Sequence, residues 1–261
     1  MNLSISKIFW LVLCFLPLNV QAVDRWQASS GTKHTAVLEL FTSEGCGLCP
    51  PAERWLYQQQ QQRTELDYIV LGFHIDYLND KKGWVDAFAK PEFSERQKQL
   101  ARLNRYQTIY TPEFVLSGES LPNWRENFNE AVSFLNEFDA QAKIHLKAYL
   151  IEDALMIDSR SQVTGEENRR HSKLYIAITE NDVISVVQGG DNAGQTFNHQ
   201  NLVRQWLGPF DLDDSGETFI EHQVKLSPDW QQDKLKLVAV IQNLSDGYIL
   251  QAVELPLTQQ K

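Results

Sequence analysis

Residues 36–51 read AVLELFTSEGCGLCPP, and this stretch decides the fold of the first half of the chain. The apolar run from Ala36 to Phe41 predicts a buried strand, and a helical pattern begins at Pro50. Cys46 and Cys49 lie between the two, at the turn from strand to helix. Two cysteines at this spacing can close a small disulfide ring, and the turn exposes them at one edge of a sheet. The stretch is typical of thiol–disulfide exchange, but it does not decide the direction of exchange.

Residues 1–22 are typical of a secretory signal peptide. Lys7 forms a short positive region, an apolar stretch covers residues 8–18, and Val20-Gln21-Ala22 supplies a small-residue cleavage site. The apolar stretch is too short to span a bilayer comfortably, which favours cleavage over an uncleaved anchor. We therefore expect a periplasmic or secreted protein with no membrane attachment after cleavage.

The cysteine count and the charge narrow the classes of function. Cys14 lies in the signal segment, so the mature chain keeps only Cys46 and Cys49, which we expect to form a disulfide in an oxidising compartment. About 239 residues remain, enough for two domains of ordinary size. The formal charge of −10 becomes −11 without Lys7, and no basic stripe stands out. This balance argues against nucleic acid or an anionic membrane surface as a partner.

Strand and helix patterns alternate in the first half. After the first strand, the sequence predicts a helix over 50–63, a strand over 66–75, a helix over 92–106, a short strand over 113–116, and a helix capped by Asn123 and ending near residue 138. Because a strand–helix–strand order implies a parallel pair, we expect a mixed sheet with helices on both faces.

The pattern changes near residue 139, where short alternating segments begin. The predicted strands cover 143–151, 154–160, 173–180, 182–188, 217–226, 234–242 and 247–255. Only 198–206 looks irregular or helical. Seven short strands at this spacing predict an antiparallel sandwich. The chain is thus divided into a signal peptide at 1–22, an α/β domain at 23–138 and an all-β sandwich domain at 139–261.

The order of elements in the first half resembles the thioredoxin fold, and the residues resemble a more particular family. That family consists of secreted bacterial proteins with a domain of unknown function, thioredoxin-like in the first half. The resemblance rests on the block Glu39–Ala52, the stretch Phe73–Tyr77, Tyr110-Thr111-Pro112, Gly190–Gly194, His199–Arg204 and the closing segment Val238–Leu255. It implies a thioredoxin-like domain over 23–138 and, by analogy alone, activity in thiol exchange.

Cys46 and Cys49 are the candidate catalytic residues. Cys46 should be the more exposed thiol and hence the attacking one, and a helix N-terminus beside it favours the thiolate. Pro50 and Pro51 lack backbone N–H groups, and two glutamates nearby, Glu44 and Glu53, bring negative charge that disfavours a thiolate. We therefore expect modest thiol activation. An inert surface disulfide remains the alternative.

Thr111 and Pro112 are the candidate substrate-binding residues. The resemblance implies that Pro112 follows a cis bond and faces the two cysteines, which leaves the Thr111 backbone free to pair with an extended segment of a partner. The alternative is an ordinary trans proline at the start of an edge strand.

His74 and Asp76 end the second strand and are predicted to support the site from behind the cysteines. Two thiolates and an imidazole would suit Cu(I), but the absence of a fourth ligand favours a histidine hydrogen-bonded to a neighbouring carboxylate. We therefore expect no metal and no cofactor. In the second half, His199 and Arg204 either bind an anion or brace a loop with Asp191 as charge partner.

Three classes of function remain open. The first is a thiol–disulfide oxidoreductase that acts on protein or peptide thiols and disulfides. The second is a non-catalytic binding module in which the disulfide is structural. The third is a dithiol protein that handles a metal such as copper.

Overall fold

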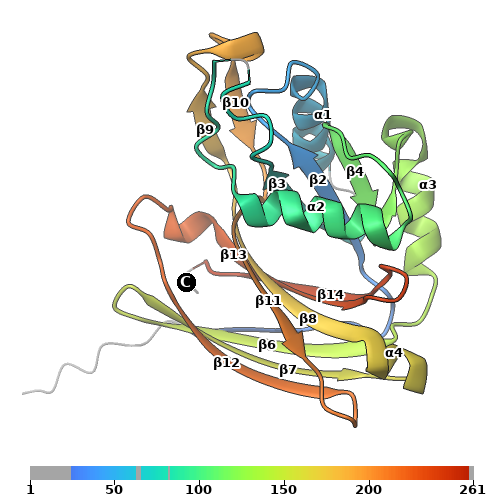
Figure 1. The fold of residues 1–261 in the computed structure, drawn as a ribbon. Helices are drawn as coiled ribbons and strands as arrows, with labels where there is room; N and C mark the ends of the chain where they lie inside the picture. Colours follow the sequence, from blue (N-terminus) through green and yellow to red (C-terminus); the bar gives the residue numbers. More distant parts are fainter. Residues whose placement is uncertain (1–24, 63–65, 82, 259–261) are drawn as a thin grey trace, which may run out of the picture.

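The computed structural model describes residues 25–62, 66–81 and 83–258, and its fold is mixed α/β with more strand than helix (Figure 1). The predicted signal peptide at 1–22 lies outside the described residues. Among the helices that are described, none is long and apolar enough to cross a membrane.

The quoted stretch forms β2 (Ala36–Thr42) and α1 (Pro50–Gln61), as its pattern predicts. β3 (Tyr68–His74) pairs with β2 in parallel, and β4 (Glu113–Leu116) pairs with the other edge of β2 in the antiparallel sense. Prolines suit the first turn of α1 because backbone N–H groups there need no partner within the helix. The carboxyl end of β2 therefore delivers both cysteines to the start of α1.

Helices cover both faces of this part of the sheet. α2 (Pro91–Leu103) lies on one face, whereas α1 and α3 (Trp124–Asn136) lie on the other (Figure 1). Asn123 precedes α3 as predicted, but its side chain makes no capping hydrogen bond. The short β5 (Glu119–Ser120) closes this edge of the sheet.

All seven strands predicted after residue 139 are present. They are β6 (Ala142–Ile151), β7 (Ala154–Val163), β8 (Ser172–Glu180), β9 (Val183–Val186), β12 (Glu217–Lys225), β13 (Leu235–Asn243) and β14 (Ile249–Pro256). The helical elements of this half are α4 (Glu166–His171) and the 3-10 turns η1 (Gly190–Asn192) and η2 (Gln232–Lys234). β1 (Arg25–Ser29), which the pattern did not predict, pairs with β6.

The prediction that 198–206 is irregular or helical is wrong. β10 (Thr196–His199) and β11 (Leu202–Asp211) occupy this region. The pairing of β11 with β8 shifts register twice, between Val203 and Gln205 and between Leu207 and Phe210. Such irregularities break the alternation of buried and exposed side chains, which is the signal that identifies a strand in a sequence.

One eight-stranded sheet runs through both halves of the chain, in the order β14-β13-β8-β11-β3-β2-β4-β5. The joint is the parallel contact of β11 with β3, where Leu202 lies opposite Gly72. A second sheet, β1-β6-β7-β12, packs against the β14–β11 end, and the β9–β10 ribbon stands beside the cysteine-bearing end (Figure 1). The sandwich and the α/β part therefore share a sheet.

The core follows from the alternation of side chains in the long sheet. Val37 and Phe41 point to the α2 face, in one cluster with residues of β8, β13 and β14. Leu38 and Leu40 point to the opposite face, against α1 and α3. Farther along that opposite face, β8 and β13 pack against the four-stranded sheet. The cluster under α2 thus joins residues from both halves of the chain.

Gly72 is expected to be sensitive to substitution because the joint is tight. A Cβ atom at this position would lie 3.3 Å from the carbonyl oxygen of Gln200 and 3.4 Å from that of Asn201. We expect Gly72→Val to lower the free energy of unfolding by about 1–3 kcal/mol, the usual cost of overpacking. Urea denaturation followed by tryptophan fluorescence measures this, with Gly31→Val as control, because a Cβ there meets nothing closer than 4.0 Å. Equal losses in the two variants would contradict a tight joint.

Candidate functional site

The two cysteines form the expected disulfide at the turn between β2 and α1. Cys46 keeps 7% of its surface exposed, whereas Cys49 is fully buried. Between them, Leu48 projects outward and is 75% exposed. A partner can therefore reach the disulfide only from the side of Cys46.

Thr111 and Pro112 lie beside this disulfide, as predicted. The Thr111–Pro112 peptide bond is cis. The carbonyl oxygen of Thr111 lies 3.7 Å from Cys46 Sγ, although the two residues are 65 positions apart. Tyr110, the preceding residue, is 46% exposed. The structure thus brings together Cys46, Cys49 and the Tyr-Thr-Pro segment at one place in the fold.

The first turn of α1 offers little help to a thiolate. Pro50 and Pro51 have no N–H group, and the N–H groups of Ala52 and Glu53 both donate to the carbonyl oxygen of Cys49, at 2.9 and 3.1 Å. The N–H groups of this turn are therefore either absent or already hydrogen-bonded within the helix, and none is free to bind an anion. The start of α1 therefore provides few backbone donors for a thiolate at Cys46.

The second half of the chain holds the cysteine loop in place. Asn192, in η1, donates from its Nδ2 to the carbonyl oxygens of Glu44 at 2.8 Å and Cys46 at 2.9 Å. Asp191 lies against the loop, because a Cβ atom on Gly47 would be 3.0 Å from Asp191 Oδ2. The segment Gly190–Gly194 therefore contacts the loop that carries Cys46, which no local pattern in the sequence indicates.

A buried cluster of charged and ionisable side chains adjoins the cysteine loop. It consists of Glu44, Glu53, His74, Asp86 and His199, each at most 7% exposed. Glu44 precedes the cysteines and Glu53 follows them in α1, while His74 ends β3 and His199 ends β10. Below, "the buried cluster" means these five residues.

Asp86 orients His74. Its Oδ2 atom lies 2.7 Å from His74 Nδ1 and also accepts a hydrogen bond of 2.8 Å from the backbone N–H of Glu44. Burial alone would raise the pKa of Asp86, but the charge and hydrogen bond of His74, with the backbone donors, outweigh it and hold the pKa at about 2. Asp86 is therefore ionised and accepts hydrogen bonds from His74 and from the Glu44 backbone.

His199 lies between two carboxylates. Its Nε2 atom is 3.1 Å from Ser185 Oγ and 3.3 Å from Glu44 Oε1, and its Nδ1 atom is 3.6 Å from Glu53 Oε2. Burial would lower the pKa of His199, but Glu44 and Glu53 outweigh it and raise the pKa to about 9. In return His199 lowers the pKa of both glutamates, against the opposing effect of burial.

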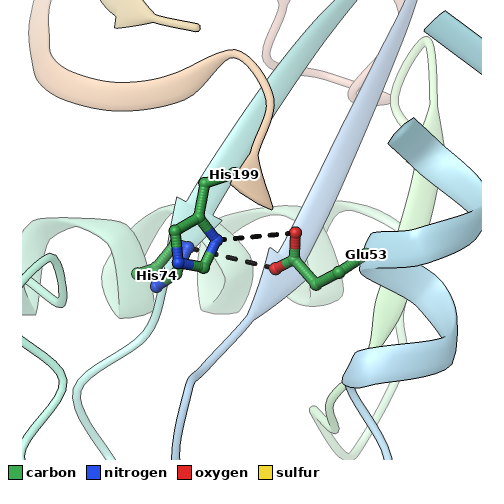
Figure 2. Close-up of side chains that lie close together, drawn as sticks. All are labelled: Glu53, His74 and His199. Atoms are coloured by element: carbon green, nitrogen blue, oxygen red, sulfur yellow. Dashed lines mark ion pairs between the residues drawn. The ribbon is translucent and has the colours of Figure 1, made fainter. Parts of the chain in front are cut away.

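Three members of the cluster could hold a metal ion. Ligand atoms of Glu53, His74 and His199 all lie within 4.8 Å of one another (Figure 2). Two of these atoms, Glu53 Oε1 and His199 Nδ1, are buried without a hydrogen-bond partner. An orphaned buried polar atom costs about 1–3 kcal/mol, so both call for an explanation.

The structure separates two predicted neighbours. Asp76 does not orient His74; it exchanges hydrogen bonds with Ser94 of α2, through its backbone N–H and its carboxylate. The reason is that the chain leaves the sheet after His74 and turns toward α2, so the carboxylate that reaches His74 comes from Asp86 instead.

His199 and Arg204 do not share Asp191 as a charge partner. His199 faces Glu44 and Glu53, whereas Arg204 pairs with Glu180 at 2.7 Å. Sequence reasoning noted the two glutamates only as nearby charges and passed over Asp86. No spacing signal could have found it, because Asp86 lies in an irregular connection.

The fold and site define a mixed α/β protein with a disulfide at a strand–helix turn and a buried histidine–carboxylate cluster beside it. The chain belongs to the DUF1223 family, described as proteins of unknown function, whose model matches residues 37–242. This confirms the predicted relationship to a family with a domain of unknown function. No curated protein is significantly similar to the chain.

Two solved structures are similar in fold. One is the crystal structure of a protein from Agrobacterium tumefaciens, with 22% identity and a TM-score of 0.60, covering 88% of this chain and 98% of that chain. The other is HBP35 of Porphyromonas gingivalis, with 19% identity and a TM-score of 0.64, covering 86% of this chain and 76% of that chain. At these identities the likeness concerns the fold alone.

Proposed function

We propose that the protein is a periplasmic or secreted thiol–disulfide oxidoreductase that acts on cysteines of proteins or peptides. The observation that carries the proposal is the placement of the Cys46–Cys49 disulfide, with Cys46 the more accessible sulfur, at 7% exposure, and 3.7 Å from the Thr111 carbonyl oxygen. A partner backbone that aligns with this segment brings its sulfur next to Cys46.

The topology around the disulfide supports a thioredoxin-like assignment. β2, α1 and β3 form a parallel strand–helix–strand unit, α2 packs on the opposite face from α1, and β4 and α3 complete it. The Thr111–Pro112 bond precedes β4 and faces the cysteines, where the thioredoxin fold places its proline. Fold alone does not establish turnover, so the chemistry rests on the site.

The proposed reaction assigns separate roles to the two sulfurs. In the reducing direction, the Cys46 thiolate attacks a substrate disulfide, forms a mixed disulfide and releases one substrate thiolate. The Cys49 thiolate then attacks Cys46 Sγ, which closes the protein disulfide and releases the second substrate thiolate. Two electrons pass to the substrate, and oxidation of a substrate dithiol is the reverse. Because Cys49 is buried, it cannot begin the reaction.

Apolar side chains at the surface suit a peptide partner. Leu48 and Tyr110 flank the disulfide, and both are exposed although large and apolar. Apolar groups near a reactive sulfur add contact area that does not depend on the partner's sequence.

A second candidate is a binding module whose disulfide is structural. Asn192 donates hydrogen bonds to two carbonyl groups of the cysteine loop. The backbone N–H groups in the first turn of α1 donate to the carbonyl oxygen of Cys49. Both observations favour a rigid loop with little thiolate stabilisation. Turnover is the property that separates the two candidates.

Reduction of insulin by dithiothreitol tests the proposal. The wild type is expected to shorten the lag before insulin precipitates, because Cys46 offers a faster route than the small thiol. The Cys46→Ser/Cys49→Ser protein is the matched control and should leave the lag unchanged. If the wild type and this control give the same lag, and if glutathione disulfide exchanges with neither, the disulfide is structural.

A further inference from the structure

We propose that Glu53, His74 and His199 form a binding site for a divalent transition-metal ion of the zinc class. This site is separate from the disulfide, and its ligands are a carboxylate oxygen and two imidazole nitrogens (Figure 2). The proposal does not depend on thiol exchange.

The distances between the ligand atoms fit a metal better than they fit hydrogen bonds. Glu53 Oε2 lies 3.6 Å from His199 Nδ1, and Glu53 Oε1 lies 4.0 Å from His74 Nε2. Both separations exceed a normal hydrogen bond. Ligand atoms around a tetrahedral zinc ion with bonds of ~2.1 Å lie about 3.4 Å apart, so a small inward movement closes the site.

The outer hydrogen bonds of both histidines point their free nitrogens at the same place. Asp86 Oδ2 is hydrogen-bonded to Nδ1 of His74, at 2.7 Å, and the other ring nitrogen of His74, Nε2, faces Glu53. Glu44 and Ser185 contact Nε2 of His199 within hydrogen-bond distance, and the other ring nitrogen of His199, Nδ1, faces Glu53. Carboxylates that hold the far nitrogen of each ligating histidine are the usual outer shell of a metal site.

Two ligand atoms, Glu53 Oε1 and His199 Nδ1, form only long ion-pair contacts, of 4.0 Å to His74 Nε2 and of 3.6 Å to Glu53 Oε2. Glu53 Oε1 and His199 Nδ1 are buried and accept or donate no hydrogen bond. The side chains of Glu53 and His199 are only 8% and 2% exposed, so bulk water does not satisfy them. A bound ion supplies the missing partner for both atoms at once.

The charge of the buried cluster also favours a cation. Three carboxylates, Glu44, Glu53 and Asp86, are buried within it. Among the described residues, no lysine or arginine forms an ion pair with any of them. The carboxylates form ion pairs with the two histidines instead, and a divalent ion between Glu53 and the imidazoles would supply the counter-charge in place of the proton on His199.

An entry route lies beside the site. A pocket of about 290 Å³ opens between α1 and β10, and Glu53 lines it together with residues of both elements. Of the three proposed ligands, only Glu53 lines this pocket, so the pocket offers an ion a route to the site from the side of that residue. Two imidazoles and one carboxylate suit zinc and its neighbours in the first transition series, and they do not suit Cu(I), which prefers sulfur.

The test is metal titration of the oxidised, metal-stripped full mature chain without added thiol. Isothermal titration with Zn²⁺ should give one site per chain. Co²⁺ should give visible bands without the near-ultraviolet band of a cobalt–thiolate bond. Zn²⁺ should also raise the Tm of the wild type. Absence of saturable Zn²⁺ binding by the oxidised wild type would overturn the proposal.

Variants locate the ion. Glu53→Gln and His199→Gln should each weaken Zn²⁺ binding by more than about 100-fold, because each removes a ligand. Asp86→Asn removes only a hydrogen-bond partner of a ligand and should weaken Zn²⁺ binding by about 10–100-fold. His145→Gln, at an exposed histidine far from the cluster in sequence, is the matched control and should bind like the wild type. Circular dichroism verifies that each variant is folded.

A cysteine-free variant separates this site from the disulfide. Cys46→Ser/Cys49→Ser should keep the Zn²⁺ affinity of the wild type. If this variant loses the ion while folded Glu53→Gln retains it, the ion is at the cysteines and the proposal is wrong. Failure of insulin reduction would leave the metal result unaffected, because the titration uses the oxidised protein.

Discussion

A reduced Cys49→Ser protein is expected to accumulate mixed disulfides with a peptide disulfide through Cys46, whereas Cys46→Ser should accumulate none. The physical reason is the difference in solvent access, because Cys46 keeps 7% of its surface exposed beside the Thr111 carbonyl group, whereas Cys49 is fully buried. Without Cys49 nothing resolves the first covalent intermediate, so it persists. The effect should be close to all-or-none, and intact-mass spectrometry measures it as one peptide added per chain.

Alkylation of the reduced wild type provides an independent measure of which cysteine reacts first. Iodoacetamide should modify Cys46 well before Cys49, as peptide mapping at short times would show. The Cys46→Ser/Cys49→Ser protein is the control for modification elsewhere. Equal rates at the two cysteines, or trapping by Cys46→Ser, would contradict the assignment of Cys46 as the attacking sulfur.

Loss of the Arg96 side chain is expected to produce the largest change in stability. Arg96 forms a bidentate ion pair with Glu39, at 2.9 and 2.8 Å, and both side chains are at most 1% exposed. Its guanidinium group also donates to Gln242 and lies over the rings of Tyr175 and Trp206. The pair therefore links α2 and β2 to strands of the second half within the core.

Arg96→Met should lower the free energy of unfolding by about 3–5 kcal/mol, because it leaves the Glu39 carboxylate buried without a partner. That is a large part of the 5–15 kcal/mol typical of a folded protein. Urea denaturation under oxidising conditions, followed by circular dichroism, measures the loss.

Two controls show whether the loss comes from the unpaired charge. Glu39→Met/Arg96→Met removes both charges and should recover most of the stability, since apolar replacements of a buried pair are often neutral. Lys33→Ala breaks the ion pair between Lys33 and Asp139, whose side chains are exposed by 59% and 85%, and should change stability very little because solvent screens the pair. If Arg96→Met loses no more stability than Lys33→Ala, the buried pair does not have the proposed role.

Local pattern alone determined much of the first half. The apolar run before the cysteines, the prolines at the start of α1 and the periodic helices are signals that act over a few residues, and the structure has elements at each of those places. The pairing of Cys46 with Cys49 also follows from sequence, because the third cysteine, Cys14, lies in the predicted signal peptide. The strands after residue 139 were predicted for the same reason, through turns and alternation.

Only the tertiary structure decided how distant segments meet. β11 was missed because its register shifts remove the alternation, yet it joins the sandwich to β3. The buried cluster draws Glu44, Glu53, His74, Asp86 and His199 from five separate segments. A sequence pattern reports which face of an element is buried, but the neighbour of that face depends on strand order and on the pairing of distant strands. For this reason the sequence indicated the disulfide, whereas the cluster beside it emerged only when β3, α1 and β10 were brought together.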